Sequence, residues 1–228
     1  MAYGCYNSAD LCGVRISLIA DDGTPIFSNP DGSAYNLNPI QLTTSVNVST
    51  GDTFEQRNGC GDVCYTKTNP DTETGEDLTL TLCTYDTEFI ALATGGGNIF
   101  DGSTEHIGFW KGVEASPLTE FHAWSKSFDG SSRVASPRSW WHHTWPQVTW
   151  TLGDRSFGEN SLIVTLNGTA VPNGNIGDGG FSDIPETRDA GSWYTASWLA
   201  DDIPVATEAP YNANGIACGY IDTPADDS

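Results

Sequence analysis

The sequence predicts a mainly β fold, namely an antiparallel β-sandwich or sheets that close into a barrel, with one short flanking α-helix. Two observations predict it. Apolar and polar residues alternate through several segments, and between these segments stand Asp-Gly and Asn-Gly pairs, which tolerate the backbone angles of tight hairpin turns. At 228 residues and 38% hydrophobic composition, the chain is long enough to bury a core within one domain.

Strands are expected where apolar residues recur at every second position. The clearest alternation lies at residues 14–18, 78–82 and 148–152, and each of these segments pairs an apolar face with a polar one. Less regular strands are predicted at 42–57, 63–68, 105–113, 118–128 and 160–167. The turn pairs that separate them begin at residues 22, 31, 101, 129 and 178 (Asp-Gly) and at 58, 167, 173 and 214 (Asn-Gly).

The one expected helix covers residues 87–94. Asp86 is suited to cap its first turn, and Glu88 lies where the helix dipole favours an acidic side chain. Phe89, Leu92 and Ala93 would share one face, and glycines at 95–97 end the run. Such a helix is expected to pack one face against a sheet.

Three parts of the chain are distinguished by composition. Residues 1–12 are interpreted as an N-terminal arm, 13–170 as the β domain, and 171–228 as a C-terminal extension rich in Gly, Pro, Asn and Asp. Within the domain, NPDTETGED at 69–77 has no apolar residue and is predicted to be a solvated loop. Its acidic residues are candidates for contacts between subunits: Asp71, Glu73, Glu76 and Asp77.

The charge of the chain excludes one class of function. Thirty acidic residues against nine basic ones give a formal net charge of −21, and the basic residues form no cluster. A protein that grips nucleic acid needs Lys and Arg to replace the counterions released from phosphates. The composition therefore argues against nucleic-acid binding, but it is compatible with a surface past which nucleic acid moves without binding.

No motif in the sequence indicates catalysis or a cofactor. The G-x-S-x-G, H-E-x-x-H, P-loop and calcium-loop patterns are absent, and carboxylate pairs are too numerous to single out an acid–base couple. Residues 1–11 lack the regions of a signal peptide, which predicts that the protein is made in the cytoplasm and stays soluble, with no membrane partner. Free thiols, disulfides and a zinc site stay open for the six cysteines, which are Cys5, Cys12, Cys60, Cys64, Cys83 and Cys218.

The densest group of aromatic residues is SWWHHTWPQVTW at 139–150. Three interpretations stay open: packing or a subunit interface, a sugar-stacking platform on Trp140, Trp141 and Trp145, and a metal site on His142 and His143. Neighbouring strand residues point to opposite faces, which argues against both histidines binding one ion. Candidates for an aromatic interface are Trp140, Trp141 and Trp145, with Trp193 and Trp198 from the C-terminal extension.

Several segments occur in an order that suggests a family. They are NGCGDVC at 58–64, DLTLTLCTYD at 77–86, EFIAL at 88–92, WPQV at 145–148 and LIVTLNG at 162–168. In this order, with the acidic loop between the first two, they resemble the major tail protein, or tail tube protein, of long-tailed phages, particularly those that infect actinobacteria. The resemblance covers about residues 12–170.

The resemblance implies a structural virion protein without a cofactor. Copies of the β domain would assemble into hexameric rings that stack into the tail tube, with other tail proteins at its ends, the tape measure protein inside, and DNA passing through unbound. Loop 69–77 and the termini would bridge subunits or rings. Four acids are candidates for the lumen: Asp52, Glu55, Glu114 and Glu120. The alternatives are a carbohydrate-binding or virion-surface adhesion module, and a β-rich hydrolase with dispersed acids.

Overall fold

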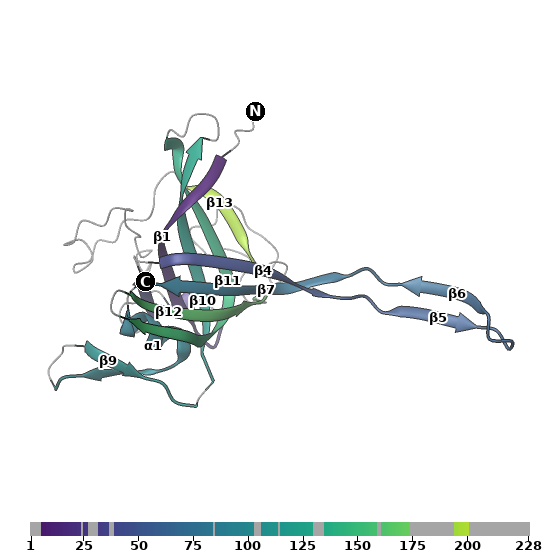
Figure 1. Ribbon diagram of the computed structural model, residues 1–228, viewed down its shortest axis with the longest axis horizontal. Coiled ribbons are helices and arrows are strands. Elements are labelled where there is room, and N and C mark those ends of the chain that lie inside the picture. Colours follow the sequence, from purple (N-terminus) through teal and green to yellow (C-terminus); the bar gives the residue numbers. More distant parts are fainter. Residues whose placement is uncertain are drawn as a thin grey trace.

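Figure 1 shows a computed structural model of the chain. It describes residues 6–23, 25–26, 32–36, 39–83, 85–102, 106–113, 115–129, 135–158, 161–173 and 194–200. The elements, in chain order, are β1 Tyr6–Ile19, β2 Pro25–Ile26, β3 Ser33–Asn36, β4 Pro39–Ser49, β5 Thr53–Arg57, β6 Val63–Thr68, β7 Thr72–Leu82, α1 Thr87–Thr94, β8 Gly97–Phe100, β9 His106–Trp110, β10 Leu118–Asp129, β11 Ala135–Gly158, β12 Ser161–Ala170 and β13 Ala196–Ala200.

The body of the molecule is a nine-stranded antiparallel sheet. Its strand order is β2-β1-β10-β11-β12-β7-β4, with β3 also beside β1 and β13 also beside β11. The sheet bends so that β4, at one end of this order, lies against β1 near the other. The prediction of a mainly antiparallel, sandwich-like β fold with one short helix is confirmed.

The core lies inside the bend of this sheet, and the predicted alternation builds it. From each strand every second residue faces inward, so the core draws on strands that lie far apart in the sheet order. Its fully buried members include Val14, Ile16, Leu78, Leu80, Leu82, Phe121, Val148, Trp150 and Leu166. The threonines between them on β7 and β12 lie on the outer face.

The helix forms where the sequence predicts it and for the predicted reasons. The Asp86 carboxylate accepts a hydrogen bond from the Phe89 backbone N–H at 3.1 Å, and the left-handed Gly95 (φ 71°) ends the helix. Phe89 and Ala93 are fully buried in the core cluster, with Leu92 packed against it. The prediction for α1 is therefore confirmed.

Two boundary predictions are wrong. The first strand begins at Tyr6, so the chain before the domain is shorter than the predicted arm of residues 1–12. Residues 72–77 are not a loop but the first half of β7, paired with β4 and β12. Of the C-terminal extension, β13 adds a strand to the main sheet beside β11.

One predicted turn is instead part of a strand. Asn167-Gly168 lies inside β12, paired with β11 and β7. A Cβ atom on Gly168 would come within 2.8 Å of the Trp150 indole ring, so the glycine allows the strand to approach that ring. Here the close packing of a large aromatic residue, rather than a turn, accounts for the glycine.

Two hairpins extend from the body. The longer one, which we call the arm, comprises residues 50–71 and contains β5 and β6. Figure 1 shows it projecting far beyond the sheet as a continuation of β4 and β7. The shorter hairpin pairs β8 with β9 and lies at another edge of the body. No helix in the described part of the chain is long and apolar enough to span a membrane.

Candidate functional site

The arm has two chemically different faces, because side chains alternate along both of its strands. Phe54 and Tyr65 lie on one face with ring centroids 6.4 Å apart. On the same face, Lys67 is paired with Phe54 and Gln56 with Tyr65. The other face carries a row of hydroxyl groups and an acid, formed by Thr53, Glu55, Thr66 and Thr68. The arm is thus an amphipathic two-stranded ribbon.

The apolar face of the arm is exposed to solvent. Phe54 is 60% exposed and Tyr65 51%, and Val46, Val48 and Val63 are further exposed apolar residues on β4 and β6. A two-stranded hairpin buries no core of its own and gains little stability in water by itself. Exposed apolar side chains gathered on such a projection are typical of a surface that packs against another protein.

Side-chain hydrogen bonds fix the shape of the arm at its base and tip. At the base, the Asp71 carboxylate accepts a hydrogen bond from the Gly51 backbone N–H at 2.9 Å, and Asn69 N–H donates to the Asp52 carbonyl at 3.0 Å. At the tip, the Asn58 side-chain oxygen accepts from the backbone N–H groups of Cys60 and Asp62, both at 2.9 Å. The arm is therefore a structured element rather than a solvated loop.

The structure separates the four acids predicted for the lumen. Asp52 and Glu55 are exposed on the arm, where Glu55 pairs with Arg57 at 3.1 Å. Glu114 lies outside the described residues. Glu120 is a correction: it is fully buried in the body and cannot face a lumen in the folded chain. Glu120 lies on the face of β10 opposite the apolar core, and the structure buries that face too.

The acids predicted for an inter-subunit loop also divide into two groups. Asp71 and Glu73 are exposed, and Glu73 accepts a hydrogen bond from the Tyr194 hydroxyl at 2.9 Å. Glu76 is only 7% exposed, and its carboxylate accepts a hydrogen bond from the Trp145 indole N–H at 2.7 Å. Asp77 accepts from the Asn47 amide and the Thr169 hydroxyl. Glu73, Glu76 and Asp77 all belong to β7, so their assignment to a loop is wrong, and only Asp71 precedes that strand.

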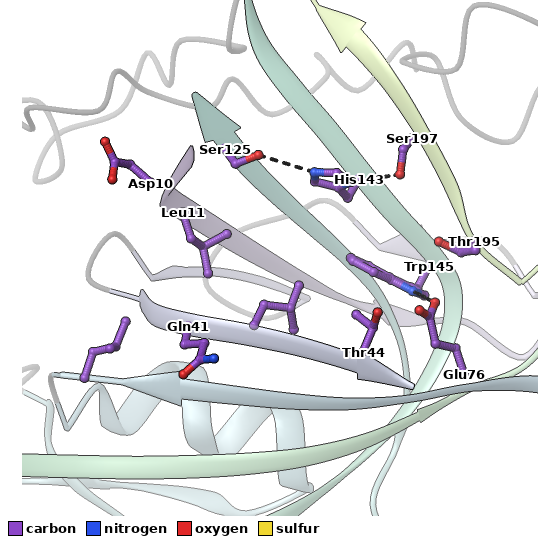
Figure 2. A pocket seen from close by; sticks show the side chains of 12 residues that line it. Asp10, Leu11, Gln41, Thr44, Glu76, Ser125, His143, Trp145, Thr195 and Ser197 are labelled. Atoms are coloured by element: carbon purple, nitrogen blue, oxygen red, sulfur yellow. Dashed lines mark hydrogen bonds between the residues drawn. The ribbon is translucent and has the colours of Figure 1, made fainter. Parts of the chain in front are cut away.

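A pocket of about 570 Å³ lies at the seam where β1 and β4 approach each other. Figure 2 shows its lining, which comes from both seam strands and from β7, β10, β11 and β13. His143 lies between two hydroxyl groups, with Nε2 3.3 Å from Ser125 Oγ and Nδ1 2.8 Å from Ser197 Oγ. Burial lowers the pKa of His143, against a smaller opposing effect of Glu76. A neutral histidine beside hydroxyl groups suits an uncharged polar ligand better than an anion.

The two adjacent histidines lie on opposite faces of β11, as their spacing predicts. His143 lines the pocket, whereas His142 is buried among Arg15, Glu120 and His122 on the other side of the sheet. Burial lowers the pKa of His122 and His142 well below the usual value, and Arg15 adds to the effect. Burial raises the pKa of Glu120 to about 8, although Arg15 acts in the opposite direction.

The aromatic candidates differ in what they offer to a partner. Trp145 is 3% exposed and packs on Phe121 at 5.3 Å between ring centroids, so its assignment to an interface is wrong. Trp140 and Trp141 are half-buried. The backbone of Trp198 pairs with His142 through β13, and Trp193 lies outside the described residues.

The described cysteines are free thiols. Cys12 is buried, while Cys60, Cys64 and Cys83 are exposed, and Cys5 and Cys218 lie outside the described residues. Within the described ranges, no group of three or more His, Cys, Asp or Glu side chains is arranged to hold a metal ion. Cys60 and Cys64 both belong to the tip of the arm, so a thiol-reactive label would report on whether that tip becomes covered.

Two features of this arrangement are not evident from the sequence. One is the projection of the arm beyond the sheet, because the sequence predicts only its strands, within 42–57 and at 63–68, and the turn that begins at residue 58. The other is the second buried face of the sheet, signalled only by Arg15 and Glu120 inside strands. Comparison with known proteins adds no identification: no protein-family model matches the chain, and no curated protein matches it in sequence.

Proposed function

We propose that the protein is a structural subunit that assembles with copies of itself, through its arm, into stacked rings forming the tail tube of a long-tailed phage. The observation that carries the proposal is the arm: a structured, amphipathic projection with Phe54 and Tyr65 exposed and no core beneath them. Packing the apolar face against a neighbouring copy would remove it from water and stabilise the assembly.

The charge of the chain supports the second half of the proposal, in which the tube is a conduit for DNA. Each subunit carries a formal net charge of −21, so a ring of copies repels a polyanion and offers no cluster of basic residues to which it could bind. The arm carries the exposed acids Asp52 and Glu55 away from the body, to where they could meet a bore or a neighbouring ring. Hexameric symmetry, capping tail proteins, a tape measure protein within the bore and location in the virion are parts of the same proposal.

Replacing the arm tests the proposal. Ser49 and Thr72 are directly paired across β4 and β7, so residues 50–71 can be exchanged for an Asn-Gly turn that closes this pair as a hairpin. We expect the shortened protein to fold, with a β-type circular dichroism spectrum and a cooperative unfolding transition, and to stay monomeric in sedimentation. The variant Thr66→Ala, on the hydroxyl face of the intact arm, is the matched control and should assemble normally. Normal tube growth without the arm would refute the proposal.

Carbohydrate binding remains the alternative prediction, and the pocket at the β1–β4 seam is the observation that favours it. Its hydroxyl groups and neutral His143 could bind a small polar ligand such as a sugar. The burial of Trp145 counts against a stacking platform made of Trp140, Trp141 and Trp145 together. A glycan-binding screen with a protein that stays monomeric would favour this alternative over assembly.

A further inference from the structure

We propose that Glu120 is protonated in the folded protein at neutral pH and donates a hydrogen bond to His122. The buried hydrogen-bonded chain that results crosses β1, β10 and β11. We call it the lock, because it makes the stability of this half of the sheet depend on pH.

The lock is built from side chains that the strand register brings together. Arg15 on β1 is paired with His122 on β10, and His122 is paired with Thr144 on β11. Glu120 lies on the same face two residues before His122, and all four side chains are fully buried. Trp124 covers the group, stacking on His142 with ring centroids 4.5 Å apart. The cluster therefore lies across three neighbouring strands on the face opposite the apolar core.

The geometry at His122 Nε2 places the proton on Glu120. Arg15 Nη2 lies 3.0 Å from this nitrogen, and a guanidinium can only donate hydrogen bonds. With Arg15 as the donor, His122 Nε2 is an acceptor that carries no hydrogen; the Thr144 hydroxyl lies 3.4 Å from the same nitrogen. Glu120 Oε1 contacts the same nitrogen, and this contact is a hydrogen bond only if the carboxyl group supplies the proton.

The chain continues from the other nitrogen of His122. A neutral imidazole that accepts at Nε2 carries its hydrogen at Nδ1. His122 Nδ1 lies 2.6 Å from His142 Nε2, so it donates and His142 accepts. One directed sequence thus runs from Glu120 through His122 to His142, with both histidines neutral.

The surroundings of Glu120 favour the neutral carboxyl group. Within the described residues its second oxygen, Oε2, is buried without a hydrogen-bond partner, which is far more costly for a carboxylate than for a carboxylic acid. Among the side chains that the structure describes, the charged and titratable groups that face the chain are Arg15 from β1 and His142 from β11, with His143 on the far side of β11. From β3 comes the uncharged Ser33, bonded to Ser17. Arg15 lies 4.0 Å from Glu120 Oε1, and its positive charge favours the carboxylate, but the effect of burial is larger.

The lock opens on both sides of neutrality, and the sign follows from proton binding. The pKa of Glu120 is raised to about 8, so the folded state holds a proton that the unfolded state has lost. This contribution is complete below the unfolded pKa and disappears as pH rises through about 8. The pKa values of His122 and His142 are lowered, so their contribution is complete above the usual histidine pKa and is lost as pH falls. Ionisation of Glu120 leaves a buried carboxylate whose Oε2 has no hydrogen-bond partner, and protonation of either histidine adds a second positive charge near Arg15.

Infrared spectroscopy tests the position of the proton directly. The wild-type protein at pH 7 should show the carbonyl stretch of a protonated carboxyl group. This band should fade as pH rises through about 8 and be missing in Glu120→Gln. The alternative is an ionised Glu120 beside an imidazolium at His122. In that case the wild type shows no such band at pH 7 and the proposal is wrong.

A second measurement keeps the test valid if Glu120→Gln does not fold. In wild-type protein labelled with ¹³C at glutamate carboxyl carbons, one resonance should titrate near pH 8. If every glutamate has finished titrating below about pH 6, the proposal is overturned.

The lock is tested by urea unfolding as a function of pH. The unfolding midpoint of the wild type should fall from about pH 6 to about pH 8 and then level off, and that of Glu120→Gln should stay level, because an amide cannot ionise. Glu55→Gln, an exposed glutamate on the arm, is the matched control and should follow the wild type. An equal fall of the unfolding midpoint in Glu120→Gln would show that ionisation of Glu120 does not control the stability of the sheet.

Discussion

The apolar face of the arm should set the concentration at which the protein assembles, and Phe54→Thr with Tyr65→Thr tests this. Threonine keeps a high preference for strands, so the arm should persist while its aromatic surface is lost. Full burial of such a side chain contributes about 1.5–3 kcal/mol. Phe54 is 60% exposed and Tyr65 51%, so roughly half of each side chain is left for a partner to cover.

These exposed fractions convert into a measurable effect. About 1 kcal/mol from each residue gives about 2 kcal/mol per arm, and at 1.4 kcal/mol per tenfold the free protein concentration at equilibrium with assembled material should rise about 30-fold. Sedimentation followed by measurement of the supernatant gives this concentration. The stability of the monomer should not change, because neither residue is part of the core cluster. An unchanged concentration, with Thr66→Ala as the reference, would refute the role of the arm.

Three further predictions concern stability and passage of DNA. Leu80→Ala removes a fully buried core side chain and should lower the free energy of unfolding by about 2–5 kcal/mol in urea denaturation; a loss below about 1 kcal/mol would contradict the packing described. Asp86→Ala removes the cap that bonds Phe89 N–H and should cost about 1 kcal/mol in the same assay, whereas Asp86→Asn, which can still cap, should cost less. Replacing Asp52 and Glu55 with Lys should leave tubes that assemble but slow DNA ejection from particles, and normal ejection would count against acids of the arm facing the DNA.

The parts of the fold that follow one local rule could be predicted from the sequence. Strands such as 14–18 and 78–82 show a period of two because one face is buried, and α1 carries its own cap at Asp86 and its own stop at Gly95. These features depend on neighbours within a few residues. That is why the fold class and the helix are correct.

The errors arise where distant partners override local composition. Residues 72–77 are polar enough to suggest a loop, but Trp145 bonds Glu76, and Asn47 and Thr169 bond Asp77, so the strand begins early. Nothing near Glu120 in the sequence indicates that Arg15, His122 and His142 will enclose it. Register between β1, β10 and β11 determines that cluster, and no local pattern encodes register across 100 residues.

Negative-stain electron microscopy of the purified full-length protein tests the central claim most directly. If the arm of each copy packs against another copy, the micrographs should show rings and tubes of uniform bore. The form in which the arm is replaced by an Asn-Gly turn should show none. A full-length protein that stays monodisperse and monomeric, with the Cys60 and Cys64 thiols at the tip of the arm still reacting freely at high concentration, would contradict it.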